Sequence, residues 1–319
     1  MKKNRRPLSS VFADDIQRYI EHQIGLGRHF RVEICILRAF DAYLDDINYN
    51  GQLTQEIVVN FVYSKPKLMS VQYGRRYTII RFFSEYRSTL YPDTPKLIPQ
   101  AVQGKAEQHP AHIYTDDEIT ALLNEAKSLR PTGSLRPLTF YTLFGLLIST
   151  GIRIGEAIRL NVDDVDLETG VIRILNTKFR KSRLVPVHES TLTVLKDYRF
   201  ACKVMFPKID SPAFFLNQRK KRIVYSTVVA TFISCARQTG IRAVTGQGPR
   251  LHDLRHTFAV KRVLEWYRSD EDVQAKLSEL ATYMGHAHFE DTTYYLTAGA
   301  EIMSIAAKRF EQSQQGVCT

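Results

Sequence analysis

The chain has 319 residues, 44% hydrophobic and 24% charged, a composition typical of a globular protein with a sizeable core. Its formal net charge of +11 favours nucleic acid as a partner, since basic side chains release counterions from the phosphates they neutralise. The four scattered cysteines show no metal-ligand spacing, which argues against disulfides and structural zinc. The basic N-terminus lacks a following apolar stretch, and the apolar run 138–148 is too short to cross a bilayer. We therefore expect a cytoplasmic protein that does not contact membranes.

After a basic tail over residues 1–10, the pattern of residues 11–90 predicts a small all-helical domain. Apolar side chains recur every three or four residues in 11–26 and 30–47, as on one face of a helix. Thr54 is a suitable N-cap for a third helix, and a fourth, over 70–90, mixes arginines with aromatic residues. The expected buried positions of the first two helices are Val11, Ile16, Tyr19, Ile20, Ile24, Val32, Ile36, Phe40, Tyr43 and Leu44.

Residues 91–110 contain four prolines and no periodicity, which is typical of a linker. We place the domain boundary near residue 107. A new helix is expected after Thr115, because Glu118 three residues later completes a capping box. The run 138–148 indicates a buried core helix.

The second domain, 111–319, is predicted to be mostly helical with one small β insert. Residues 170–175 and 183–188 are β-branched and alternating, and they flank a polar turn, so they predict a hairpin. Further helices are expected over 191–205, 227–240, 253–267, 271–285 and 300–312. The whole chain is therefore expected to be mainly α.

Two pairs of residues in this domain suit the binding of an anion. Arg153 and Glu156 lie three apart just after Gly151, and a turn that leads into a helix is a common place to present a cation. The alternative is an ordinary surface ion pair. His252 and Arg255 are likewise three apart at a helix start, where a solvated helix end with a chance histidine is the alternative.

Two further segments complete the candidate set. Gly285 is expected to end a helix, and His286, Tyr294 and Tyr295 follow it. The hairpin turn is either a finger that reaches into DNA or a solvated basic turn; its basic residues are Lys178, Arg180, Lys181 and Arg183. Together these side chains could break a phosphodiester without a metal. Arginines neutralise the phosphate, histidines donate hydrogen bonds or move protons, a lysine protonates the leaving oxygen, and a tyrosine attacks.

In this order, TGIRIGEAIRL, TKFRKSRLVPVH, LHDLRHTFAV and MGHAHFEDTTYYL resemble the successive motifs of the tyrosine recombinase (phage-integrase) family. The resemblance covers the second domain, and the N-terminal helices are similar to the family's core-binding domain. The hairpin and the C-terminal segment most resemble recombinases of transposons and other integrating elements.

The resemblance implies that Tyr295, nine residues after His286, is the nucleophile, and that Tyr294 is a packing or DNA-facing aromatic. Phe179 stands where many family members have glycine, which leaves Lys181 as an alternative to Lys178 as the catalytic lysine. The full implied catalytic set is Tyr295, Arg153, Lys178, His252, Arg255 and His286, with Glu156 as the acidic neighbour of Arg153.

The implied activity is site-specific cleavage and rejoining of double-stranded DNA through a 3′-phosphotyrosyl bond, without metal, ATP or another cofactor. It would serve integration, excision or transposition of a mobile element. A homotetramer would act on two DNA sites, with the need for sister recombinases or an accessory factor left open. The helix over 300–312 would either pack on its own domain or dock on a neighbouring protomer. The candidate DNA contacts are Arg75, Arg76, Arg81, Arg180, Lys181 and Arg183.

Three alternatives stand beside this interpretation. A type IB topoisomerase uses nearly the same residues to relax supercoils. A DNA-binding accessory protein could keep the fold with a silent site, although the catalytic inventory here is complete. A basic helical protein with no DNA role is the third.

Overall fold

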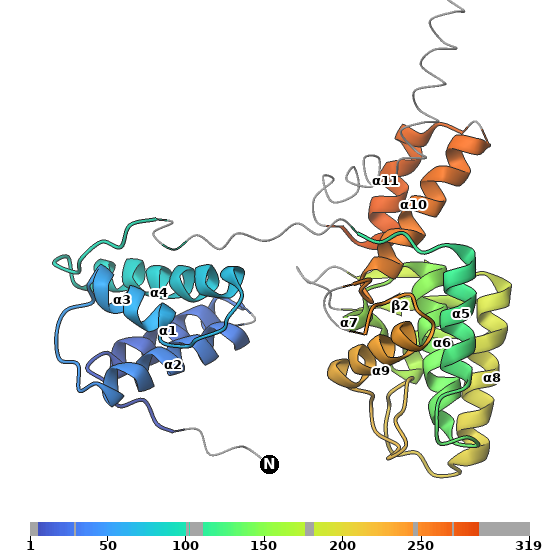
Figure 1. Cartoon of the computed structure of the whole chain (residues 1–319), viewed down its shortest axis with the longest axis horizontal. Helices are drawn as coiled ribbons and strands as arrows, with labels where there is room; N and C mark the ends of the chain where they lie inside the picture. Colours follow the sequence, from blue (N-terminus) through green and yellow to red (C-terminus); the bar gives the residue numbers. More distant parts are fainter. Residues whose placement is uncertain are drawn as a thin grey trace, which may run out of the picture. The chain divides into compact units, whose positions relative to one another are not determined.

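The computed structural model describes residues 6–28, 30–99, 102, 111–175, 182–244, 248–269 and 271–286 (Figure 1). The described chain is mainly α, with one small antiparallel sheet, as the sequence predicts. It divides into two compact units, Met1–His109 and Pro110–Thr319. None of the helices within the described residues combines the length and hydropathy needed to cross a bilayer.

The first unit consists of helices α1 (Ala13–Gly25), α2 (Arg31–Asp46), α3 (Gln55–Tyr63) and α4 (Ser70–Leu90) around one apolar core. Thr54 caps α3 as predicted, its side-chain oxygen accepting from the Ile57 N–H. The buried face is narrower than expected, because Val11, Ile24 and Val32 lie exposed. In α1 the buried stripe continues to Gln23 rather than Ile24. Gln23 lies seven residues after Ile16 and Ile24 lies eight after it. Because two turns of a helix take about seven residues, Gln23 lies closer to the buried face.

Arg76 of α4 lies inside this core. Its Nη2 donates to the Phe61 carbonyl oxygen at 2.7 Å, and its guanidinium lies 4.0 Å from the Phe61 ring centre. This placement corrects the expectation that Arg76 contacts DNA. Arg75 is exposed and Arg81 is half-buried; they form ion pairs with Glu33 and Glu85, respectively.

The second unit is built around α6 (Leu135–Thr150), which packs chiefly against three other helices (Figure 1). These are α5 (Asp116–Lys127), α8 (Glu189–Met205) and α10 (Asp253–Arg268). The predicted capping box at the start of α5 is confirmed: Glu118 N–H donates to Thr115 Oγ1 at 3.1 Å, and Thr115 N–H donates to Glu118 Oε2 at 2.9 Å. The remaining helices are α7 (Ile154–Ala157), η1 (Val162–Asp164), α9 (Tyr225–Gln238) and α11 (Val273–Met284).

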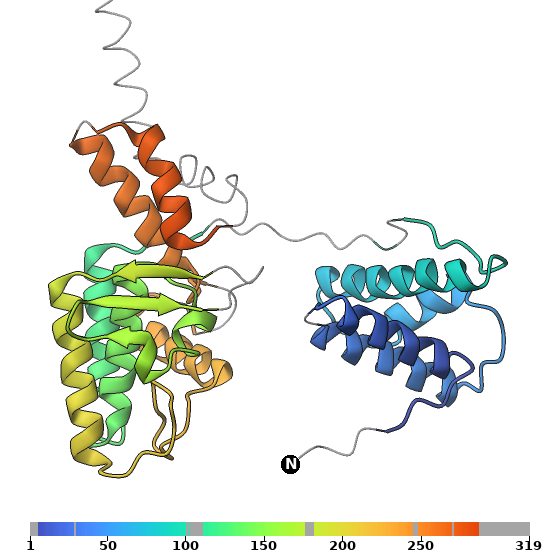
Figure 2. The same ribbon diagram turned by 180° about the vertical axis from the view of Figure 1, so that it is seen from behind.

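The predicted hairpin is confirmed as β2 (Val171–Ile174) and β3 (Arg183–Pro186), paired antiparallel with Ile174 opposite Arg183. Figure 2 shows these strands in front of the helices of the second unit. A third strand, β1 (Val165–Asp166), pairs with β2 and was not expected, because two residues are too few to show an alternating pattern. The inward side of the hairpin buries Ile172, Ile174 and Val185.

Several predicted features lie outside the described residues. They are Lys178, Phe179, Arg180, Lys181, Tyr294, Tyr295 and the helix over 300–312.

Candidate active site

The site begins at the glycine that ends α6. Gly151 has φ +61°, a left-handed conformation that strains other residues, and a Cβ there would lie 2.5 Å from Cδ1 of Phe258 on α10. Glycine therefore allows the backbone to turn against α10. The chain then passes through buried Ile152 to Arg153, two residues beyond the turn.

Arg153 and Glu156 do not merely share a helix face, because two hydrogen bonds connect them. Arg153 is the N-cap of α7; its backbone N–H donates to Glu156 Oε2 at 3.0 Å, and its Nη1 donates to Oε1 at 3.1 Å. The Arg153 side chain nevertheless stays 37% exposed. Its guanidinium is thus oriented by a carboxylate while part of it faces solvent, where a phosphate could approach.

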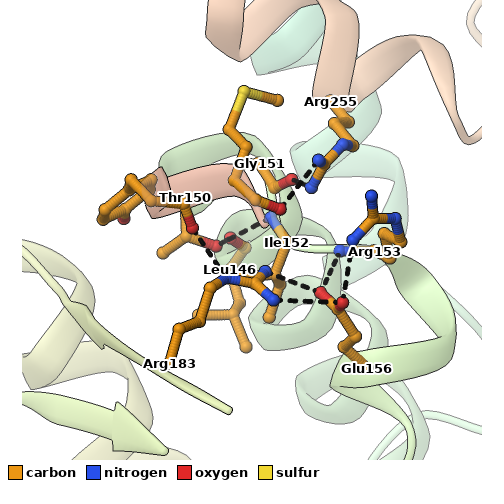
Figure 3. Close-up of polar contacts among 10 residues, drawn as sticks. Leu146, Thr150, Gly151, Ile152, Arg153, Glu156, Arg183 and Arg255 are labelled. Atoms are coloured by element: carbon orange, nitrogen blue, oxygen red, sulfur yellow. Dashed lines mark hydrogen bonds and ion pairs between the residues drawn. The ribbon is translucent and has the colours of Figure 1, made fainter. Parts of the chain in front are cut away.

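Glu156 is only 4% exposed and receives a second arginine. Arg183, the first residue of β3, donates from Nη1 to Oε1 at 3.2 Å and from Nη2 to Oε2 at 2.8 Å (Figure 3). Burial acts to raise the pKa of the Glu156 carboxyl, but the hydrogen bonds and charges of Arg183 and Arg153 outweigh it and hold that pKa below its usual 4.5. The carboxylate therefore stays ionised between two arginines.

Arg183 was expected to contact DNA, but in the free protein its side chain points inward, to Glu156 and Tyr283. Its side chain is 9% exposed, and its Nε also donates to the Tyr283 carbonyl oxygen at 2.7 Å. The alternating pattern of β3 could have predicted this placement. Arg183 lies two residues before buried Val185 and therefore on the same face of the strand.

Arg255 joins the ends of two helices. It is 3% exposed; its Nη1 donates to the Gly151 carbonyl oxygen at 2.6 Å and its Nη2 to the Met284 carbonyl oxygen at 2.8 Å (Figure 3). These carbonyls belong to the C-terminal ends of α6 and α11, where helix oxygens lack intrahelical partners and a cation is favoured. The orientation of Arg255 is therefore fixed before any ligand binds.

His252 stands immediately before α10, partly open to solvent and partly covered by its neighbours. Desolvation, followed by the neighbouring His256 ring and the charge of Arg255, lowers the pKa of His252 to about 4. The charge of Arg153 acts in the same direction. His252 is therefore neutral at pH 7, and the two arginines lie close enough for their charge to reach it.

His256, one turn further along α10, packs its ring edge-to-face against His252, with the ring centres 5.0 Å apart. Asp253 between them was not singled out from the sequence. It is 2% exposed and accepts from the Arg250 N–H at 2.8 Å and from Arg250 Nη2 at 3.0 Å, which fixes the start of α10. The sequence could have indicated this role of Asp253, because a carboxylate at the start of a helix often accepts from the backbone N–H three residues before it.

His286 follows the predicted helix end. Gly285 adopts φ +69° as the left-handed cap of α11, and the His286 N–H donates to the Ala281 carbonyl oxygen at 3.0 Å. His286 thus lies two residues beyond Met284, whose carbonyl Arg255 binds. The structure brings together Arg153, Glu156, His252 and Arg255, and joins His286 to them through the end of α11.

Comparison with known proteins identifies the class of protein that carries this site. Residues 113–301 match the model of the phage integrase family. The integrase/recombinase y4rB of Sinorhizobium fredii is 36% identical over 311 residues, which are 95% of this chain and 98% of that protein. The chain therefore belongs to the phage integrase family of tyrosine recombinases.

Solved structures share the fold. The Tn1549 transposon integrase in complex with transposon right end DNA has a TM-score of 0.64 at 15% identity, covering 93% of this chain and 98% of that one. A lambda integrase tetramer bound to a Holliday junction has a TM-score of 0.57 at 15% identity, covering 89% of this chain and 80% of that one.

Proposed function

We propose that this protein cuts and rejoins double-stranded DNA at specific sites, with Tyr295 as the nucleophile. The observation that carries the proposal is the group formed by Arg153, His252 and Arg255 around the Gly151 turn. Such a group suits a phosphate whose negative charge must be stabilised in the transition state. The choice of Tyr295 rests on its spacing from His286.

The two arginines would hold the non-bridging oxygens of the scissile phosphate. The carbonyl bonds of Arg255 use part of its five N–H donors and fix their direction, so little reorganisation is needed when charge develops. Glu156 would keep Arg153 from rotating away from the phosphate. His286 would donate a further hydrogen bond to a phosphate oxygen.

The cleavage step exchanges one ester bond for another. The Tyr295 oxygen attacks phosphorus, its proton passes to neutral His252, and the bond from phosphorus to the 5′ oxygen breaks. Lys178, with Lys181 as the alternative, gives the departing 5′ oxygen its proton. The 3′-phosphotyrosyl bond retains the energy of the original ester, so a 5′-hydroxyl of the partner strand can reverse the step without a nucleotide.

DNA binding would use both units. The first unit would act as the core-binding domain, with Arg75 and Arg81 on phosphates and Arg180 and Lys181 contributing from the hairpin turn. A homotetramer on two DNA sites and a role in moving a mobile element are supported by the assemblies named for lambda integrase and the Tn1549 integrase. Residues 300–312 would dock on a neighbouring protomer.

A two-site exchange assay tests this function. Two DNA fragments of different length, each carrying a junction of the mobile element that encodes the protein, should yield products of recombinant length. Tyr295→Phe should yield none while it still binds both fragments. Relaxation of a supercoiled plasmid without recombinant products would instead support a topoisomerase.

A further inference from the structure

One guanidinium connects three segments that each lead to a proposed catalytic residue. Arg183 opens β3, whose hairpin turn contains Lys178. Its Nε donates at 2.7 Å to the Tyr283 carbonyl oxygen near the end of α11, just before His286. Its two terminal nitrogens donate to Glu156, the residue that orients Arg153 (Figure 3).

The Arg183 guanidinium also occupies the space beside Gly285. A Cβ on Gly285 would lie 2.6 Å from Arg183 Nη1 and 2.9 Å from Cζ. Gly285 is the residue at which the chain leaves α11 towards His286 and the tyrosines. The guanidinium therefore packs directly against the residue that ends α11.

Strand β3 is attached to α11 at its other end too. The Tyr283 hydroxyl donates to the Pro186 carbonyl oxygen at 3.2 Å, and its ring stacks on Phe258 with the ring centres 5.8 Å apart. At the end of α11, consecutive carbonyls are bound by different arginines: that of Tyr283 by Arg183 and that of Met284 by Arg255. The β3–α11 attachment is thus part of the site's framework.

We propose that Arg183 is a positioning residue for the recombination chemistry: it aligns the start of β3, the end of α11 and the Arg153–Glu156 pair, and it makes no contact with DNA. This rests on the function proposed above. Loss of the guanidinium would misplace groups that must meet at one phosphate, and a misplacement of about 1 Å is enough to slow a reaction ~100-fold.

The test is a single-turnover cleavage experiment on nicked DNA, from which the short strand with the freed 5′-hydroxyl is lost, so that the covalent product accumulates while the leaving group stays an oxygen. The rate at saturating protein and the half-saturating concentration are measured separately for the wild type, Arg183→Ala and Arg183→Lys. Arg173→Ala is the matched control, because Arg173 is an exposed arginine on the adjacent strand β2 and bonds the Asp163 carbonyl oxygen.

Arg183→Ala should lower the saturating rate ~100-fold without changing the half-saturating concentration or its salt dependence. Arg183→Lys, which keeps one charged contact to Glu156, should recover part of the rate and remain folded. Arg173→Ala should keep the wild-type saturating rate. An unchanged saturating rate in both Arg183 variants overturns the proposal. So does a higher half-saturating concentration with a shallower salt dependence, which would make Arg183 a DNA contact.

A second measurement does not depend on DNA cleavage. In the free protein, Arg183→Lys should speed hydrogen exchange of the Gly285 and His286 amides, which donate within the end of α11. Unchanged exchange there counts against the proposal. If the wild type itself forms no covalent product, the proposed function fails, and the exchange result still decides whether Arg183 positions the end of α11.

Discussion

Gly151 is the residue on which the geometry around Arg153 most depends. Its positive φ and its contact with Phe258 both exclude a side chain. Gly151→Ala should therefore lower the free energy of unfolding by about 2–4 kcal/mol, from left-handed strain and from displacement of a buried ring. Urea unfolding followed by circular dichroism measures this change.

Gly145 provides the matched control for Gly151. It lies within the same helix, α6, and a Cβ there would meet no atom within 4 Å. Gly145→Ala should leave stability unchanged or raise it by up to ~1 kcal/mol, because alanine is the better helix former. An equal loss in both variants would show that the Gly151 turn is not special.

His252 carries a prediction about pH. Its pKa is lowered from the ordinary 6.5 to about 4. Since the unfolded chain binds a proton that the folded protein does not, the free energy of unfolding should fall as pH drops from 6.5 towards 4. Imidazole NMR of the free protein should give a His252 midpoint well below 6.5.

Bound DNA should change that midpoint. A phosphate between Arg153 and Arg255 offsets the positive charge that disfavours protonation, so the pKa of His252 should rise in the complex. The variant His256→Gln removes the imidazole signal of the neighbouring His256, which distinguishes it from the signal of His252. A midpoint near 6.5 in the free protein would contradict the site's electrostatics as described.

At the scale of elements, the site depends on the start of α10. Asp253→Ala removes the acceptor of the Arg250 N–H, so His252 and Arg255 should lose their alignment. We expect a loss of about 1–3 kcal/mol in the free energy of unfolding and a slower cleavage of bound DNA. Single-turnover cleavage at saturating protein measures the second effect.

Asp272→Ala is the comparison for Asp253→Ala, because Asp272 accepts the Gln274 and Ala275 N–H groups at the start of α11. It should also destabilise the protein, by about 1 kcal/mol, but leave the cleavage of bound DNA near wild type. If the two variants slowed cleavage equally, stability rather than the alignment of α10 would explain the loss.

Elements with a strong local pattern could be predicted from the sequence. Thr115 and Glu118 fixed the start of α5, and the alternation around Val185 revealed β3. The burial of the Arg76 and Arg183 side chains was missed because a charged residue is usually exposed, although both lie on the same face as buried residues of their own element. The two bonds of Arg255 span 104 and 29 residues, and no local pattern encodes such contacts.

At the scale of the whole molecule, the chain combines two compact units with a net charge of +11. Each described unit has its own apolar core. The residues proposed for chemistry all belong to the second unit, while the first unit offers exposed Arg75 and partly exposed Arg81. This division fits the proposal that the first unit serves DNA binding and the second unit also cleaves the DNA.

Covalent trapping tests the central claim most directly. The protein is incubated with nicked DNA from the ends of the mobile element proposed to encode it and separated on a denaturing gel, alongside Tyr295→Phe and Tyr294→Phe. We predict a protein–DNA adduct in the wild type and in Tyr294→Phe, and none in Tyr295→Phe. Loss of the adduct in Tyr294→Phe alone would move the nucleophile by one residue, and a wild type that binds this DNA without forming any adduct would contradict the proposed chemistry.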